Sequence, residues 1–470
     1  MSWSDYGFSG ISSSFQNYFY RPIKDEKPEI SIESNENLGL PSKEDVKLYG
    51  TKAFDCFKEV WDFEDFWKRA NTCDACLSLV DELLIKNPDD IEVKEICKTF
   101  QGILEKNLNY YKSLSHDDKW IDDFGWWGLL GVNAYKFLMK LSDFNLAIAY
   151  LELSGECWTD MINHGYDVNE NIKPVKYGCK NSTSLLPNVG VKNSVVNTLL
   201  FLLSTKLYTL YIEKKFSNPD PYLKMAYQQW LWFLNWFELK SYGYLKSFKD
   251  DEGSGLIGER PLAFFNGSDY QDTSHPDSTT GSVWTGDNGL LIGGLFELMA
   301  VKNQLFEYAT HHQPYWKFNL EDFDTKIKEI TTKLIHGVQK GMIGKDGIFH
   351  EPPCLLSYVT NAKDYYGGRG ILIRYMDLKK VEAFSGVDFK ENILKTVNAI
   401  WLTRDVNSNQ FQVEFTTDEN NLNYVKQFDT LWGISDQSSR WLIGSEDLKL
   451  RNAIAQALGM DFLAGALKVV

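Results

Sequence analysis

The stretch NSVVNTLLFLLSTKLYTLY, residues 193–211, is apolar on nearly every side of the helix that its composition predicts. Such a helix, outside a membrane, must be enclosed by neighbours on several sides. By contrast, the apolar residues from Ile91 onward recur at steps of three and four, which predicts a helix of about twenty residues with a single buried stripe. The sequence therefore predicts helices deep inside the protein as well as helices that pack with one face.

Helical periodicity continues along most of the chain, whereas strand signals are weak and scattered. Together with the two helices above, this predicts about twelve helices and an all-α protein. The further helices are expected near 44–60, 62–86, 122–141, 144–163, 219–238, 287–303, 321–340, 368–383, 389–402 and 436–466.

Residues 1–44 are polar, acidic and marked by prolines, which predicts a loosely ordered N-terminal arm. No linker divides the chain after it, so residues 45–470 are expected to form a single domain. Two gaps in helicity, 164–191 and 240–283, are long for a compact domain, and their aromatic residues favour functional loops.

The 470-residue chain carries a formal net charge of −15 and shows no Lys/Arg stripe along a predicted helix, which argues against nucleic acid as a partner. We find no signal-peptide pattern at the N-terminus and no membrane-spanning run, so a cytoplasmic protein is expected, with export by another route as the alternative. Seven irregularly spaced cysteines favour reduced thiols. No cofactor and no metal site is predicted, and a monomer is expected.

Residues 120–131, WIDDFGWWGLLG, place two consecutive acids, Asp122 and Asp123, at the head of an apolar helix. One interpretation is structural: Asp122 caps the helix and Asp123 is a first-turn acid, and both suit the positive end of the helix dipole. A cap needs only one carboxylate, however, and Gly125 and Gly128 leave room for a ligand to approach the backbone. The acid pair is therefore a candidate catalytic site.

Glycoside hydrolysis uses two neighbouring carboxyl groups, one ionised and one whose pKa is raised by burial and by its charged neighbour. Because consecutive Cα atoms lie ~3.8 Å apart, Asp122 and Asp123 reach the ~5–5.5 Å carboxyl separation of a retaining enzyme more easily than the ~6.5–9.5 Å of an inverting one. The spacing thus favours retention, and the helix N-terminus stabilises the ionised nucleophile.

Five blocks in the order DDFGWWGLLGVNAYKF, VKNSVVNTLLFLLSTKLY, VWTGDNGLLIGGLFEL, GIFHEP and DYYGGRGILIRY resemble glycoside hydrolase family 76. This family comprises the α-1,6-mannanases and related fungal proteins that process cell-wall mannan. The resemblance covers residues from about 55 to 465, and it implies an (α/α)6 toroid, six helical hairpins around a central cleft. The helix count made without the resemblance agrees with this fold.

Matched position by position, the resemblance implies Asp122 as the nucleophile and Asp123 as the general acid/base. The positions expected to bind substrate in addition are Lys192, Asn193, Asn197, Trp284, Thr285, Asp287, Asn288, Asp364 and Arg369. For the first three, which form a K-N-x-x-x-N helix start, the alternative is a helix cap with a buried amide. For the last two the alternative is an ion pair at a helix start.

Departures from the family pattern predict different contacts with the sugar. The family's W-T-Y-N-Q-G appears here as W-T-G-D-N-G at 284–289, the loop YGCKNSTSLLPN lacks the family's Trp, and Arg369 replaces a common Lys. Asp287 is expected to be an acid at a helix N-terminus, with a third site carboxylate as the alternative.

Three tryptophans, Trp126, Trp127 and Trp284, are the preferred sugar platforms, because the apolar face of a sugar packs on indole and these residues flank the candidate acids. The tryptophans at 230, 232 and 236 are assigned to the core, since their spacing does not place all three on one helix face.

The resulting hypothesis is a retaining glycoside hydrolase for α-linked mannose-type glycans, with hydrolysis and transglycosylation both open. A toroid that binds carbohydrate without turnover is the alternative, favoured by the altered W-T-G-D-N-G block. Unsaturated glucuronyl hydrolases and sugar epimerases also use helical toroids, but the sequence blocks fit them less well.

Overall fold

The computed structural model describes a helical unit that spans Leu40–Val470. Most of the predicted N-terminal arm, and most of the two long loops, lie outside the described residues. The described residues are 39–117, 119–167, 177–181, 192–238, 245–258, 263–265, 270–272, 283–352, 367–413, 415–432 and 448–470.

The described part of the chain is predominantly helical, which confirms the all-α prediction. Its α-helices are α1 (Lys43–Val60), α2 (Phe66–Lys86), α3 (Ile91–Ser113), α4 (Ile121–Lys140), α5 (Phe144–Asp160), α6 (Ser194–Lys214), α7 (Asp220–Glu238), α8 (Thr285–Ala300), α9 (Lys302–His312), α10 (Leu320–Gly341), α12 (Gly368–Tyr375), α13 (Leu378–Ser385), α14 (Lys390–Leu402), α15 (Asp418–Trp432) and α16 (Leu448–Val469).

A closed ring of helices forms the inner wall of the fold. In order around the ring these are α2, α4, α6, α8, α12 and α16, each in contact with the next, and α16 returns to contact α2. A second layer lies outside: α3 packs on α2, α5 on α4, α7 on α6, α10 on α8, and both α1 and α14 on α16. This is the (α/α)6 toroid expected from the sequence.

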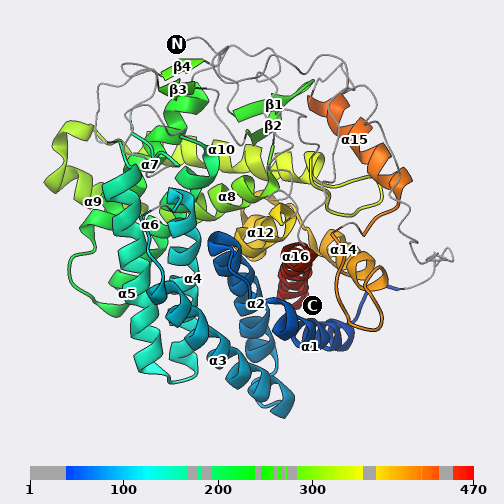
Figure 1. The fold of residues 1–470 in the computed structure, drawn as a ribbon. Coiled ribbons are helices and arrows are strands. Elements are labelled where there is room, and N and C mark those ends of the chain that lie inside the picture. Colours follow the sequence, from blue (N-terminus) through cyan, green and yellow to red (C-terminus); the bar gives the residue numbers. More distant parts are fainter. Residues whose placement is uncertain are drawn as a thin grey trace, which may run out of the picture. The chain divides into compact units, whose positions relative to one another are not determined.

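The ring closes by joining the two ends of the helical unit. Figure 1 shows α1 and α16, the first and the last described helices, side by side. Gln456 of α16 donates from Nε2 to the Ala53 carbonyl of α1 at 2.9 Å. This contact links residues 403 positions apart in the sequence.

The inner and outer helices differ in the way that their sequences predict. Helix α6 buries residues on all sides, whereas the outer helix α10 buries a stripe that includes Phe323, Ile327, Leu334 and Val338. Helix α6 is also long and apolar enough to cross a membrane, but most of it is buried inside the protein. Its apolar surface is therefore explained by its place in the inner ring.

A short β-structure replaces part of the region predicted as a loop at 240–283. Strands β1 (Leu245–Phe248) and β2 (Asp251–Ile257) pair antiparallel, as do β3 (Ala263–Phe265) and β4 (Tyr270–Asp272). Strand β2 packs on α10 and α8, and α15 contacts β1. The alternation of the β strands was too short to be recognised in the sequence.

The helix predictions differ from the structure at three places. The predicted helix 287–303 corresponds to α8, which ends at Ala300 because the backbone leaves the helical region at Val301, and the following helix α9 was not predicted. The predicted helix 368–383 is divided into α12 and α13, because Asp377 caps a new helix by accepting from the Lys380 N–H. Helix α15 was not predicted, and the predicted helix 436–466 overlaps α16, which the structure describes from Leu448 onward.

A buried ion network crosses the inner ring between α2, α12 and α16. Arg374 donates two hydrogen bonds of 2.7 Å to the Asp461 carboxylate and lies 3.2 Å from Asp74 Oδ2. Asn71 accepts from the same guanidinium at 2.9 Å, and Asn133 of α4 donates to Asp74 at 2.9 Å. We call Arg374, Asp74 and Asp461 the central ion network.

Candidate active site

The aspartate pair lies in the first turn of α4, an inner-ring helix. Trp120 is the N-cap, so Asp122 and Asp123 occupy the second and third helical positions and neither is the N-cap residue. The structural interpretation of Asp122 as an N-cap is therefore wrong. Asp123 is buried and Asp122 is partly buried. Carboxylates in this turn face the positive end of the helix dipole.

Burial raises the pKa of Asp123 well above its usual range, and the charges of Asp122 and Asp65 raise it further. Lys119 and a hydrogen bond from the Trp120 backbone N–H oppose this rise without cancelling it. Asp123 therefore holds a proton at pH values where an ordinary aspartate has lost it. A raised pKa of this kind is what a general acid requires.

The glycines of α4 serve helix packing. A Cβ at Gly125 would lie 2.7 Å from Leu199 Cβ, and one at Gly128 would lie 2.5 Å from Leu203 Cδ2. Both leucines belong to α6, so the glycines let α4 and α6 approach closely. This corrects the expectation that the two glycines leave space for a ligand.

Residues 177–181 join the N-terminal ends of α4 and α6. The Ile121 N–H donates to the Asn181 carbonyl at 3.1 Å. Asn197 of α6 brackets Cys179, accepting from its N–H at 2.7 Å and donating to its carbonyl at 3.0 Å. Asn193 caps α6 by accepting from the Val196 N–H at 3.2 Å. The two asparagines thus have the cap and buried-amide roles of the alternative interpretation, and they fix the start of α4.

Lys192 is the buried cation of this region. Its Nζ lies 3.0 Å from Asp167 Oδ2 and donates to the Tyr177 carbonyl. Burial lowers the pKa of Lys192 to about 8, and Asp167 limits the decrease. The lysine therefore anchors residues 177–181 from the α6 side.

Two of the three predicted platform tryptophans, Trp126 and Trp284, meet beside the aspartate pair, but both are buried, so the prediction that their rings stack on a sugar is wrong. Trp126 lies one turn beyond Asp122 on α4. Its ring is 6.3 Å from that of Trp284 in an edge-to-face arrangement, and 5.9 Å from that of Trp67. Trp284 is the N-cap of α8. The structure thus brings the W-T-G-D-N-G block next to the aspartate helix.

The third predicted platform, Trp127, belongs to the core. It has no exposed surface, donates from Nε1 to the Phe66 carbonyl at 3.1 Å, and packs on Tyr111. A ring covered on both faces cannot stack on a sugar, so the platform assignment for Trp127 is corrected. Trp120, which was not selected from the sequence, is 55% exposed two residues before Asp122.

The start of α8 carries three more predicted site residues. Asn288 accepts from the Ile257 N–H at 3.0 Å and donates to the Trp284 carbonyl at 3.0 Å, so it holds β2 on α8. Asp287 is fully buried in the first turn, as expected for an acid at a helix N-terminus. Thr285 donates from its N–H to Glu351 Oε1 at 2.9 Å.

Glu351 was missed as a site residue, although it lies in the quoted block GIFHEP. It is buried, and burial raises its pKa to about 8, while hydrogen bonds from Thr285 and the charge of Arg369 oppose the rise. A buried acid with a raised pKa beside a predicted site is a functional candidate. Its partner lies 66 residues away in sequence, so local pattern could not indicate it.

Arg369 is buried at the start of α12. Its Nη2 donates to the Val413 carbonyl at 2.9 Å, and its guanidinium lies 4.4 Å from the centre of the Phe415 ring. It also acts electrostatically on Glu351. Asp364, its predicted partner, lies outside the described residues.

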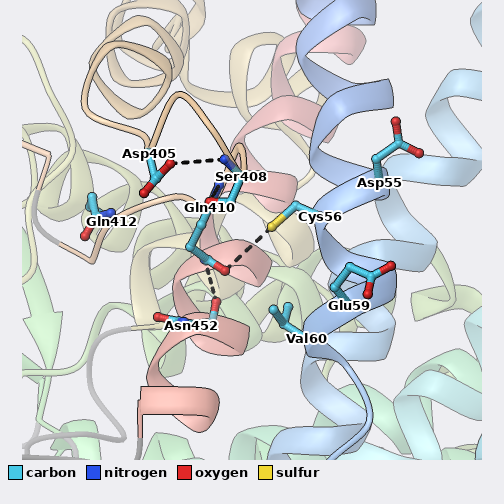
Figure 2. A pocket seen from close by; sticks show the side chains of 9 residues that line it. All are labelled: Asp55, Cys56, Glu59, Val60, Asp405, Ser408, Gln410, Gln412 and Asn452. Atoms are coloured by element: carbon cyan, nitrogen blue, oxygen red, sulfur yellow. Dashed lines mark hydrogen bonds between the residues drawn. The ribbon is translucent and has the colours of Figure 1, made fainter.

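A separate cavity of about 540 Å³ is bordered by three parts of the chain: helix α1, helix α16 and the segment that follows α14 (Figure 2). Its lining is polar and acidic, and none of the predicted site residues contributes to it. The lining residues are Asp55, Cys56, Glu59, Val60, Asp405, Ser408, Gln410, Gln412 and Asn452.

A scan against protein-family models finds no match, and a search of curated proteins finds none. The fold is nevertheless similar to solved structures. An inactive variant of an α-1,6-mannanase from Salegentibacter sp. HEL1_6, in complex with α-1,6-mannotriose, is 14% identical over 91% of this chain and 100% of that chain, with a TM-score of 0.53.

A second similar structure is a glycoside hydrolase family 76 mannosidase from Bacteroides thetaiotaomicron. It is 11% identical over 90% of this chain and 98% of that chain, with a TM-score of 0.54. At these identities the likeness concerns the fold. This chain has the toroid fold of the family 76 α-1,6-mannanases, so the resemblance seen in the sequence is confirmed for the fold.

Proposed function

We propose that this protein is a retaining glycoside hydrolase that cleaves α-linked mannose-type glycans. The observation that carries the proposal is the pair of consecutive carboxyl groups in the first turn of an inner-ring helix, where burial and Asp122 raise the pKa of Asp123. At the second and third positions of α4 both carboxyl groups lie at the positive end of the helix dipole, which favours the ionised form of a nucleophile.

In the first step the Asp122 carboxylate attacks the anomeric carbon while Asp123 gives its proton to the leaving glycosidic oxygen. The carbon–oxygen bond breaks, and a glycosyl ester forms on Asp122. In the second step Asp123, now ionised, takes a proton from water, which attacks the anomeric carbon and releases Asp122. The two inversions give net retention, and a sugar hydroxyl in place of water gives transglycosylation.

The substrate class is supported by the fold. One of the similar structures is an inactive α-1,6-mannanase variant bound to α-1,6-mannotriose, in which two consecutive aspartates are replaced by asparagine. This chain carries two consecutive aspartates on an inner-ring helix of the same fold. The different W-T-G-D-N-G block predicts a preference among mannose-type glycans that differs from that of these mannanases.

The test is turnover of α-1,6-linked manno-oligosaccharides by wild type, Asp122→Asn and Asp123→Asn. Each variant should lose at least about 10³-fold in kcat, because each removes a group that acts in bond cleavage. Glu59→Gln, which alters an acid of the separate cavity, is the matched control and should keep wild-type activity. NMR of the first-formed product should show retained anomeric configuration.

An activated aryl mannoside separates the two roles. Its leaving group needs no proton, so the first step, formation of the glycosyl ester on Asp122, should be nearly as fast in Asp123→Asn as in wild type. Asp122→Asn should stay inactive on the same substrate. An inverted product, or full activity of Asp122→Asn on the oligosaccharide, contradicts the mechanism. Binding by wild type without any turnover favours the alternative, a carbohydrate-binding toroid.

A further inference from the structure

Asp123, the acid of the proposed reaction, lies on the side of α4 that faces α2. Trp127 follows Asp123 by one turn on the same face of the helix. Its indole donates to the Phe66 carbonyl at 3.1 Å, and its ring lies 5.4 Å from the Phe66 ring. Phe66 is the first residue of α2. Asp123 therefore lies next to the point at which α2 begins.

Asp65, the residue before Phe66, is the N-cap of α2, and both oxygens of its carboxylate have a partner. Oδ1 accepts from the Lys68 N–H at 3.2 Å, and Oδ2 lies 3.4 Å from Lys68 Nζ. The Asp65 side chain is 26% exposed, whereas that of Lys68 is almost fully buried. These contacts fix a negative charge at the head of α2.

The place of this charge gives Asp65 a second role besides the structural one. Capping α2 does not require a carboxylate, because Asn and Ser cap a helix as well as Asp does. Burial and Asp122 raise the pKa of Asp123, and the charge of Asp65 raises it further. A fixed negative charge beside a carboxyl group opposes the loss of its proton, so Asp65 favours the protonated form of Asp123.

The other charged groups around this turn oppose Asp65 or act on other side chains. Lys119, in the segment before α4, favours the ionised form of Asp123. The remaining groups act on the Cys179 thiol or on Asp160; they are Lys180, Lys192, His116 and His164. Asp65 and Lys119 are thus two charges of opposite sign that act on the same carboxyl group.

We propose that Asp65 is a positioning residue for bond cleavage, whose fixed carboxylate keeps the proton on Asp123 until the glycosidic oxygen takes it. The inference rests on the proposed function, because it uses Asp123 as the acid of that reaction. Asp65 acts through Asp123, so its loss should change the pH dependence of cleavage more than the rate at the optimum pH.

The experiment records kcat/KM against pH for wild type, Asp65→Asn and Lys119→Gln with α-1,6-linked manno-oligosaccharides. The alkaline limb of the profile reports the loss of the proton from the acid in the free enzyme. Asp65→Asn keeps a cap but removes the charge, so its alkaline limb should lie about 0.5–1 pH unit below that of wild type. Lys119→Gln should move the limb upward. An unshifted limb, or an upward shift, in Asp65→Asn would overturn the proposal.

Asp90→Asn is the matched control for the structural role of Asp65. Asp90 caps the outer helix α3 by accepting from the Val93 N–H at 3.2 Å, pairs with Lys47, and has a side chain that is 27% exposed. Asp90→Asn should lower the unfolding temperature about as much as Asp65→Asn and should keep the wild-type pH profile. A shift of the alkaline limb equal to that of Asp65→Asn would contradict the electrostatic role.

A stability measurement tests the inference without turnover. If wild type neither binds nor cleaves the oligosaccharides, the proposed function fails, and the effect of Asp65 on Asp123 is then measured by thermal unfolding at pH 8. Asp123→Asn should raise the unfolding temperature less in the Asp65→Asn background than in wild type, because Asp123 ionises more readily without the neighbouring charge. An equal or larger rise refutes the inference. If Asp65→Asn does not fold, Asp65→Ser replaces it, since serine also caps without a charge.

Discussion

The central ion network and the aspartate pair both place carboxyl groups inside the same helical ring, but the charges next to these carboxyl groups differ. Arg374 meets Asp461 in a bidentate pair, and the carboxylates of Asp461 and Asp74 raise the pKa of the buried guanidinium despite its burial. Burial raises the pKa of Asp461 as well, but Arg374 opposes that rise, whereas at the start of α4 the adjacent Asp122 adds to the effect of burial on the pKa of Asp123. The two regions share α4, where Asn133 follows Asp123 by ten residues, or about 15 Å of helix.

The difference indicates which region serves stability and which serves chemistry. A buried charge is tolerated when hydrogen bonds and an opposite charge offset its lost hydration, as in the central ion network. Asp123 is buried and has like-charged neighbours, and both effects raise its pKa well above the usual range of an aspartate. Functional sites are where such unfavourable electrostatics are retained.

The largest expected effect on stability comes from breaking the central ion network. Arg374→Met should lower the free energy of unfolding by about 3–5 kcal/mol, because it leaves Asp74 and Asp461 buried without their cation. Chemical denaturation followed by far-UV circular dichroism measures this change. Arg404→Met, at a partly buried arginine that lies 3.6 Å from the Trp401 ring centre, is the control and should cost much less. Equal effects of the two substitutions would show that the network carries no special stability.

A smaller and opposite effect is expected at the aspartate pair. The folded-state pKa of Asp123 lies above the unfolded value, so the stability that its protonated form contributes is present at low pH and is lost as pH rises through the folded-state pKa. Asp123→Asn cannot ionise, and it should therefore be more stable than wild type by an amount that grows with pH above about 4.

Thermal unfolding of both proteins between pH 4 and pH 8 measures this difference. The variant should gain stability while it loses activity, the opposite of Arg374→Met. A difference that shrinks as pH rises would mean that Asp123 is stabilised as the anion, and its assignment as the acid would then be wrong.

The smallest expected effect concerns an aromatic residue beside the pair. Trp120 is 55% exposed at the start of α4, and one face of its ring is expected to stack on a sugar. Trp120→Ala in the Asp122→Asn background should weaken oligosaccharide binding by up to about tenfold, since aromatic contacts contribute ~0.5–1.5 kcal/mol beyond area burial. Tyr315→Ala, which alters a 66% exposed ring after α9, is the control. Equal Kd values for both variants would remove Trp120 from the binding site.

Much of the helical layout could be predicted from the sequence, because the apolar residues on the buried face of a helix recur at steps of three and four. The all-round apolar stretch 193–211 became inner helix α6, and the stripe from Ile91 became outer helix α3. Predictions failed where the local pattern was continuous but the backbone was interrupted, as at Asp377 between α12 and α13. They also failed for α15, whose buried Tyr424 and Phe428 stand in a largely polar segment.

The sequence by itself determined which residues are neighbours along a helix. These include Asp122 and Asp123, because the covalent chain fixes the distance between consecutive Cα atoms. Only the tertiary structure decided which distant side chains join them. It paired Glu351 with Thr285, brought Trp284 to Trp126, and buried Trp127 while leaving Trp120 exposed. The physical reason is that periodicity encodes the buried face of a helix, whereas the partner of that face depends on packing between segments far apart in the chain.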